Sequence, residues 1–275
     1  MKILISVDIE GVAGVFHPEQ VRAGNGEYER ARVWMSDEAN AAVSGALAGG
    51  ASKVWVNDSH GGFRNLLPDR IDPRAQLVLG KPRYLGMMAG LEYGCRGVLM
   101  IGYHGRSQSR GILAHTINSR AFARVWLDEQ EVGEAGLYGA LAEAQGARVL
   151  LASGDDVLGE EVQTRFPGIR HVQTKQAAGF GTGSTLAPRE SCAQIAAAAR
   201  EAVAQAVAAG TPSGAAAEAP VRCRVQTTGP AYADLFGQLP FVERLDGVTL
   251  AFDAPHIAYA VRILNSMSAM SFMLA

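Results

Sequence analysis

The sequence predicts an α/β protein in which a largely parallel sheet is covered by helices on both faces. Short apolar runs recur along the chain, as in KILISVDI, KVWVND and GVLMIG. Stretches rich in helix formers separate these runs, and buried strands that alternate with helices form parallel sheets. With 275 residues, the chain can bury a large core, as one domain or as two unequal ones.

The expected elements follow one another in a regular order. The first helix covers residues 28–50 and ends in two glycines, a common stop signal. A second helix begins at Glu134 and extends to Gly146. The strands expected in this part of the chain are residues 2–9, 53–58, 75–79 and 97–102, then 121–127 pairing with 130–132, and finally 148–156.

The last third of the chain predicts a long helix, a linker and a smaller unit. Residues 188–209 are rich in alanine, the strongest helix former, and predict a long helix. GTPSGAAAEAP then reads as a loop or linker. The tail reads as strand, helix, strand and helix, at residues 221–228, 232–239, 247–254 and 255–270. We therefore expect an α/β domain over residues 1–210 and a smaller C-terminal α/β lobe over residues 219–275, packed on the first.

Composition argues against several classes of function. The net charge is −2 and the Lys and Arg residues are dispersed, so no surface for nucleic acid or an anionic membrane is expected. Three cysteines without a CxxC pair argue against a disulfide framework and favour a reducing cytoplasm. The first residues lack the long apolar region of a secretory signal. No stretch approaches the roughly 20 apolar residues of a membrane span.

Two acids close the first expected strand. Asp8 and Glu10 are two positions apart, and residues i and i+2 of a strand face the same side, so both carboxylates can reach one site. The short Asp side chain can bridge two cations while the longer Glu binds one of them. Gly11 then lets the backbone turn away. A lone DxE pair more often marks exposed acids at a strand end, so it needs partners to indicate a metal site.

Two histidines provide those partners. His60 in NDSHGG and His104 in GYHG each follow an apolar run, and ligands bind at the carboxyl ends of strands in open α/β sheets. A single histidine in such a place is more often a hydrogen-bonded structural residue. Two of them together with Asp8 and Glu10 favour a two-metal site, because imidazole is a common metal ligand. The 1–210 domain is therefore interpreted as a metal-dependent hydrolase.

Two further residues are open to more than one reading. Glu134 opens a helix, where an acid is sufficiently explained by the helix dipole. His115 could be a general acid/base, since imidazole titrates near neutral pH, or a buried structural residue. The other histidines are expected at the surface or in structural roles: His17, His171 and His256.

Three further segments give weaker indications of structure or function. Residues 179–184, GFGTGS, lack the Walker and dinucleotide patterns, and a flexible loop is expected there. SGDD at 153–156 predicts a turn and a helix cap. Lys175 could neutralise a substrate carboxylate, although a solvated lysine is the default expectation.

Several motifs occur together in one order along the chain: SVDIEGVAG at 6–14, YERAR and DEAN within 28–40, VNDSH at 56–60, GYHGR at 102–106, AHT at 114–116, VGEAGL at 132–137, then SGDD and TKQA. Through these motifs and their order, the chain resembles the zinc-dependent D-aminopeptidases, which are cytoplasmic metallopeptidases linked to dipeptide transport in bacteria. A set of separate motifs in the right order is far more specific than any one of them.

The resemblance implies a centre with two zinc ions. Asp8 would bridge the ions, with Glu10 and His60 on one of them. His104 and Glu134 would hold the other, and His115 would be catalytic. Mn²⁺ and Co²⁺ also suit this mixed set of nitrogen and oxygen donors. The ions would activate a water and bind the free amino group of the substrate, which explains removal of the N-terminal residue only.

The expected function is hydrolysis of the N-terminal residue from short peptides, in particular D-amino-acid peptides such as D-Ala-D-Ala. The resemblance also implies a cytoplasmic homo-oligomer, a decameric ring. The charge and composition predict no nucleic-acid or membrane partner. One alternative is an L-selective aminopeptidase or another binuclear metal amidohydrolase. The alternative from another class is a non-catalytic, ring-forming protein that binds peptides or metal.

Overall fold

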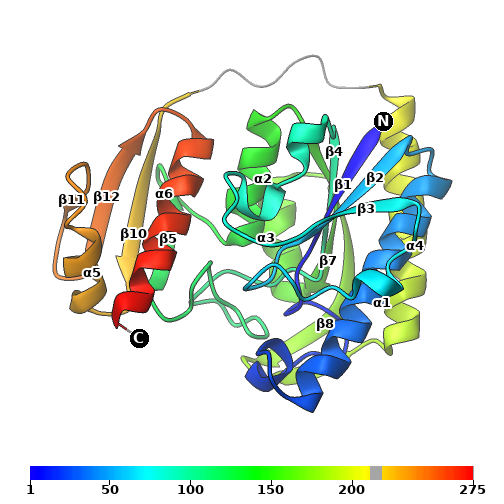
Figure 1. Cartoon of the computed structure of the whole chain (residues 1–275), viewed down its shortest axis with the longest axis horizontal. Helices are drawn as coiled ribbons and strands as arrows, with labels where there is room; N and C mark the ends of the chain where they lie inside the picture. The colour runs from blue at the N-terminus through cyan, green and yellow to red at the C-terminus, as the bar shows by residue number, and fades with distance from the viewer. Residues whose placement is uncertain (211–218, 275) are drawn as a thin grey trace.

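The computed structural model describes residues 1–210 and 219–274, and its larger sheet forms the centre of the main lobe (Figure 1). The strand order is β3-β2-β1-β4-β7-β8-β9, and only β9 runs antiparallel to its neighbour. The strands are β1 (Lys2–Val7), β2 (Lys53–Asp58), β3 (Ala75–Val78), β4 (Gly97–Ile101), β7 (Arg148–Asp155), β8 (Arg170–Gly179) and β9 (Thr182–Thr185).

Helices cover both faces of this sheet, which confirms the predicted fold class. α1 (Gly26–Ala48) and α4 (Pro188–Ala208) pack together on one face. α2 (Glu134–Ala144) and α3 (Asp156–Arg165) cover the other face (Figure 1). Successive residues of a strand point to opposite faces. Ile3 and Ile5 therefore join the core under α1 and α4, whereas Leu4 joins the core under α2 and α3.

A second, antiparallel sheet has the strand order β11-β12-β10-β5-β6. Its elements are β5 (Phe122–Leu127), β6 (Gln130–Glu131), β10 (Val221–Thr227), α5 (Pro230–Phe236), β11 (Glu243–Arg244), β12 (Thr249–Ala254) and α6 (Ile257–Met270). The predicted pairing of residues 121–127 with 130–132 is found, but in this sheet rather than the parallel one. The lobe is thus built from the middle and the end of the chain.

The division at residues 210 and 219 stays a prediction. Residues 122–131, which it assigns to the first domain, form two strands of the second sheet. The predicted linker over 210–220 falls mostly on 211–218, which lie outside the described residues. Short 3-10 helices complete the fold: η1 (Pro18–Val21), η2 (Pro68–Arg70), η3 (Gly86–Met88), η4 (Leu91–Tyr93) and η5 (Ser271–Leu274).

The loop predicted over residues 179–184 is wrong. Gly179 ends β8, and residues 182–185 form β9, so this glycine-rich segment is a β-hairpin. Gly183 permits the close pairing, because a Cβ at this position would lie 2.0 Å from the carbonyl oxygen of Gln176. SGDD does cap a helix, as predicted, since Asp155 accepts a hydrogen bond from the backbone N–H of Leu158 at the start of α3.

The final helical segment differs from the prediction that no stretch of the chain approaches the length of a membrane span. Residues 257–274 form an 18-residue stretch with a mean hydropathy of 1.3, which is long and apolar enough to cross a membrane by composition alone. One face of α6 is nevertheless buried in the core of the second lobe, through Val261, Leu264 and Met267. The segment therefore has the arrangement of an amphipathic helix packed on a sheet.

Candidate metal centre

The carboxyl ends of three neighbouring strands bring the first candidate ligands together. β1 lies between β2 and β4, and Asp8, His60 and His104 follow these strands. Asp8 and Glu10 lie just beyond β1, so a turn rather than the pleat of a strand places them. Both side chains are buried, at 2% and 3% exposure. Gly11 is required in this turn, because a Cβ there would lie 1.8 Å from the carbonyl oxygen of Tyr103.

The Asp8 carboxylate lies between the two histidines. Its Oδ1 is 3.2 Å from His60 Nδ1, and its Oδ2 is 3.5 Å from His104 Nε2. Glu10 Oε2 lies 3.0 Å from His60 Nδ1, on the same side as Asp8 Oδ1. The two oxygens of one carboxylate therefore face two different imidazoles, and Glu10 belongs to the His60 side.

Glu134 and His115 complete the cluster on the His104 side. Glu134 is the first residue of α2, and its Oε1 lies 3.6 Å from His104 Nε2 and 3.5 Å from His115 Nε2. The His115 ring stacks on the His104 ring, with centroids 4.2 Å apart and planes 11° apart. Glu134 thus lies at the amino end of α2, where the helix dipole favours an acid, and its carboxylate also reaches the cluster. All six predicted site residues converge at this edge of the sheet.

Backbone carbonyls set the tautomers of the three imidazoles. His60 Nε2–H donates to Val21 O over 2.8 Å, and His104 Nδ1–H donates to Gly105 O over 3.0 Å. His115 Nδ1–H donates to Leu113 O over 3.0 Å. When the ring is neutral, its other nitrogen therefore carries a lone pair toward the carboxylates, an arrangement typical of metal-binding histidines.

The electrostatics of the cluster fit a cation site. Burial opposes the charge of His104, but the carboxylates of Glu134 and Asp8 outweigh this effect and raise its pKa to about 10. Burial also opposes ionisation of Asp8, yet the His104 and His60 imidazoles beside it hold its pKa well below the usual range. Carboxylates that attract protons onto imidazoles this strongly attract divalent cations for the same reason, since either neutralises their charge.

Two overlapping groups of donor atoms are close enough to hold an ion. Asp8, Glu10 and His104 form one group, and His104, His115 and Glu134 form the other; within each, the atoms lie within 4.8 Å of one another. His104 Nε2 is buried and has no hydrogen-bond partner among the described residues. The donor set and this orphaned nitrogen both fit bound divalent metal.

Lys175 supports the turn that carries Asp8 and Glu10. The side chain is 2% exposed, and its ammonium group donates to the carbonyl oxygens of Glu10 and Val15, the latter over 2.7 Å. Both sequence readings of Lys175, a substrate-binding cation and a solvated surface residue, are therefore wrong. A buried ammonium group needs several acceptors, and the turn over residues 10–15 supplies them.

Replacing Lys175 with methionine is expected to weaken zinc binding. The change leaves two buried carbonyl oxygens without their donor, which costs roughly 1–3 kcal/mol for each group. Substituting a residue that orients metal ligands typically lowers metal affinity by about 10–100-fold. Competition with a chromophoric chelator measures the zinc affinity, and Lys53→Met, at an exposed lysine beside Trp55, is the matched control. Unchanged zinc affinity in Lys175→Met would contradict the supporting role.

Other residues outside the cluster hold its loops. The Asp155 carboxylate accepts from Ile112 N over 2.7 Å and so ties the segment that leads to His115 to the cap of α3. His17 and His256 accept hydrogen bonds at helix amino termini, as expected for structural residues. His171 is partly buried, and desolvation lowers its pKa.

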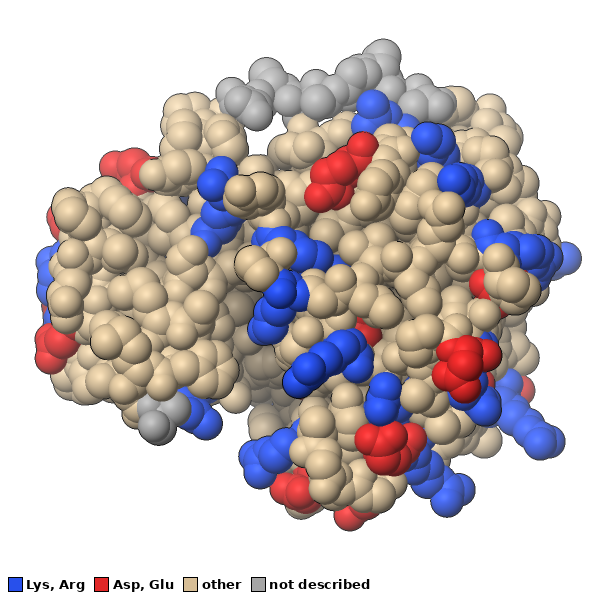
Figure 2. Space-filling view, in the orientation of Figure 1, with Lys and Arg blue, Asp and Glu red and all other residues tan. Residues whose placement is uncertain are grey.

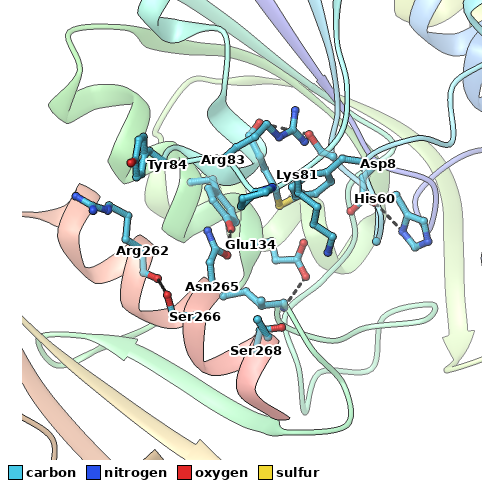
Figure 3. Close-up of a pocket in the computed structure, with 18 of the residues that line it drawn as sticks. Asp8, His60, Lys81, Arg83, Tyr84, Glu134, Arg262, Asn265, Ser266 and Ser268 are labelled. Atoms are coloured by element: carbon cyan, nitrogen blue, oxygen red, sulfur yellow. Dashed lines mark hydrogen bonds and ion pairs between the residues drawn. The ribbon is translucent and has the colours of Figure 1, made fainter. Parts of the chain in front are cut away.

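A pocket of about 780 Å³ opens over the cluster, and both lobes line it (Figure 3). Asp8, His60, His115 and Glu134 line the side of the pocket that holds the cluster. The segment that follows β3 contributes Lys81, Arg83 and Tyr84, and α6 contributes Arg262, Asn265 and Ser266. The sequence reading missed these wall residues. Their only signal was the position of Lys81 and Arg83 after a strand at the ligand-binding edge of the sheet.

Comparison with known proteins gives a consistent result. A model of the D-aminopeptidase family, peptidase family M55, matches residues 1–266. A D-aminopeptidase of Bacillus subtilis (strain 168) is 33% identical over 190 residues, which are 68% of each chain. The solved structure of the Zn-dependent D-aminopeptidase DppA from Bacillus subtilis, described as a self-compartmentalizing protease, matches with a TM-score of 0.89. It is 27% identical, and the match covers 99% of this chain and 98% of that one.

Proposed function

The chain belongs to the D-aminopeptidase family, and from that premise we propose that it is a dizinc aminopeptidase. Its proposed substrates are short peptides with an N-terminal D-residue, such as D-Ala-D-Ala. The observation that carries the proposal is the Asp8 carboxylate, whose two oxygens lie 3.2 Å from His60 and 3.5 Å from His104. A carboxylate placed in this way is suited to bridge two cations.

The proposed ligand assignment follows the contacts around Asp8. Glu10 and His60 would share one zinc, since Glu10 Oε2 and His60 Nδ1 are 3.0 Å apart. His104 and Glu134 would share the other, and Asp8 would bridge. Zinc is proposed because the related structure is zinc-dependent and because mixed imidazole and carboxylate donors suit it; the same donors also bind Mn²⁺ and Co²⁺.

The proposed reaction divides the work between metal and protein. Two divalent cations supply Lewis acidity, which polarises a carbonyl and makes water nucleophilic near neutral pH. His115 would move the proton, because it lines the pocket and its Nδ1–H donates to Leu113 O, which leaves Nε2, 3.5 Å from Glu134 Oε1, free to exchange a proton. It would accept a proton from the attacking water and deliver it to the leaving amine. Stacking on His104 holds the His115 ring in this orientation.

We also propose that the protein is a cytoplasmic homo-oligomer, a decameric ring. The description of the related structure as self-compartmentalizing supports assembly, and three free cysteines suit a reducing compartment. Sedimentation of the zinc-loaded protein tests the assembly. The proposal predicts a particle ten times the 29.0 kDa chain, and a monomer would contradict it.

Stereoselectivity is tested with matched D-Ala and L-Ala p-nitroanilides and zinc-loaded enzyme. We expect kcat/KM for the D compound to exceed that for the L compound by roughly 100-fold or more, since a pocket that orients the Cα substituents misplaces the wrong enantiomer. Dialysis against a chelator should abolish turnover, and added zinc should restore it. A strong preference for the L compound would replace this proposal with an L-selective enzyme.

A further inference from the structure

The wall of the pocket carries basic side chains of different kinds. Lys81, Arg83 and Arg262 line it, whereas the acidic residues that line it, within residues 1–210 and 219–274, are Asp8 and Glu134. Figure 2 shows Lys and Arg side chains gathered around the hollow between the two lobes. Because Asp8 and Glu134 are proposed metal ligands, their charge is directed to the cations, and the basic wall remains available to an anion.

Arg83 is already engaged in holding the fold. Its guanidinium group donates to Asn57 Oδ1 and, over 2.6 Å, to the carbonyl oxygen of Asp58, and it lies 3.8 Å from the Phe63 ring centroid. Arg262 lies over the Tyr84 ring at 4.7 Å. Figure 3 shows Arg262 extending from α6 toward Tyr84 and away from Glu134.

Lys81 differs from both arginines. Figure 3 shows its side chain extending from the segment after β3 into the pocket, toward the side that holds Glu134. In the part of the chain that the structure describes, no acceptor or carboxylate pairs with its ammonium group; its neighbours are the Phe63 ring at 5.2 Å and the like charge of Arg83. Lys81 is exposed as a whole residue, but partial desolvation of its ammonium group and the like charge of Arg83 lower its pKa. An unpaired cation in such surroundings gains most from an anionic ligand.

We propose that Lys81 binds the C-terminal carboxylate of the peptide substrate and so selects short peptides with a free C-terminus. This inference rests on the proposed function, because the metal cluster must hold the N-terminal residue. An extended chain advances about 3.3–3.6 Å per residue, so a dipeptide or tripeptide carries its carboxylate only one or two such steps beyond the scissile carbonyl. A pocket of about 780 Å³ encloses a ligand of this size.

The test compares D-Ala-D-Ala with D-Ala-D-Ala amide, which lacks only the terminal charge. Zinc-loaded wild type should prefer the free acid, and Lys81→Met should lower kcat/KM for the acid by roughly 10–100-fold, the size of one hydrogen bond to a charged group. Turnover of the amide should stay within about twofold. Lys81→Arg should keep part of the preference. Lys53→Met, which removes an exposed lysine packed on Trp55, should behave as wild type.

Two results would overturn the proposal. The first is equal turnover of the acid and the amide by wild type. The second is an equal fall in kcat/KM for both substrates in Lys81→Met, which would indicate a structural role for Lys81. If the proposed function itself is wrong, the result is different: zinc-loaded wild type and variants then cleave neither the two dipeptide substrates nor D-Ala p-nitroanilide. In that case calorimetric binding of the dipeptide and its amide to wild type and Lys81→Met decides the question, and equal affinities would overturn the subsite.

Discussion

Asp8→Ala is expected to lose both of the proposed zinc ions and most of the turnover together. The two oxygens of this carboxylate face His60 and His104 separately, so its removal takes a ligand from both proposed ions. No other described carboxylate touches both imidazoles. We expect zinc content to fall from two equivalents toward none and kcat/KM to fall by roughly 10³-fold or more, since the activation of water depends on the metal.

Elemental analysis of the purified variants, together with p-nitroanilide assays, measures this effect. His104→Ala should also lose metal and activity together, because it removes the ligand of the second ion and the ring on which His115 stacks. Asp37→Ala is the control, since the Asp37 side chain is 41% exposed and its one ion pair among the described residues is with Arg70 at 3.0 Å. Two equivalents of zinc retained in both Asp8→Ala and His104→Ala would contradict the ligand assignment.

Asp8 is buried, so the substitution could also disturb folding. Asp8→Asn keeps the shape and removes the charge, and it should retain the circular dichroism spectrum of wild type while losing metal. A normal spectrum with no metal separates loss of ligation from loss of the fold. Normal zinc content in a well-folded Asp8→Asn would show that the charge of Asp8 is not needed for binding.

The sequence predicted the central part of the sheet because those strands are buried on both faces and read as continuous apolar runs. β8 was missed because RHVQTKQAAG is rich in polar side chains, and two of its buried positions, Thr174 and Lys175, are polar. α3 was missed because only Leu158, Gly159 and Val162 of its ten residues are buried. Elements with one exposed face carry a weaker apolar pattern, so they were harder to recognise.

The candidate site was predictable to different degrees. Asp8, His60 and His104 follow neighbouring parallel strands, and that topology alone brings them together. Glu134 lies on a helix that follows the long loop and the β5-β6 hairpin, so only the family resemblance pointed to it. The burial of Lys175 against backbone carbonyls has no signature in the sequence. The part of the pocket wall that α6 forms depends on how the two lobes pack, which local patterns do not encode.

The role of His115 decides whether the cluster has five ligands or six. Its Nε2 lies 3.5 Å from Glu134 Oε1, almost the same as the 3.6 Å from His104 Nε2 to that oxygen, so distance alone accepts either histidine as a ligand. The two differ in exposure: the His104 side chain is 1% exposed, whereas that of His115 is 20% exposed and lines the pocket. A residue that exchanges protons with substrate needs this access.

His115→Ala is therefore expected to keep two equivalents of zinc while kcat falls by roughly 10²–10⁴-fold, the usual contribution of a general acid/base. KM should change little, because the metal ligands and Lys81 remain. Elemental analysis and steady-state kinetics on the same preparation measure both quantities, and His115→Gln, which can still form hydrogen bonds, should be equally slow if proton transfer is the function. Loss of one zinc equivalent from His115→Ala would instead show that His115 is a metal ligand. If wild type and variant both bind zinc and both show equal, negligible turnover, the protein is a binding protein rather than an enzyme.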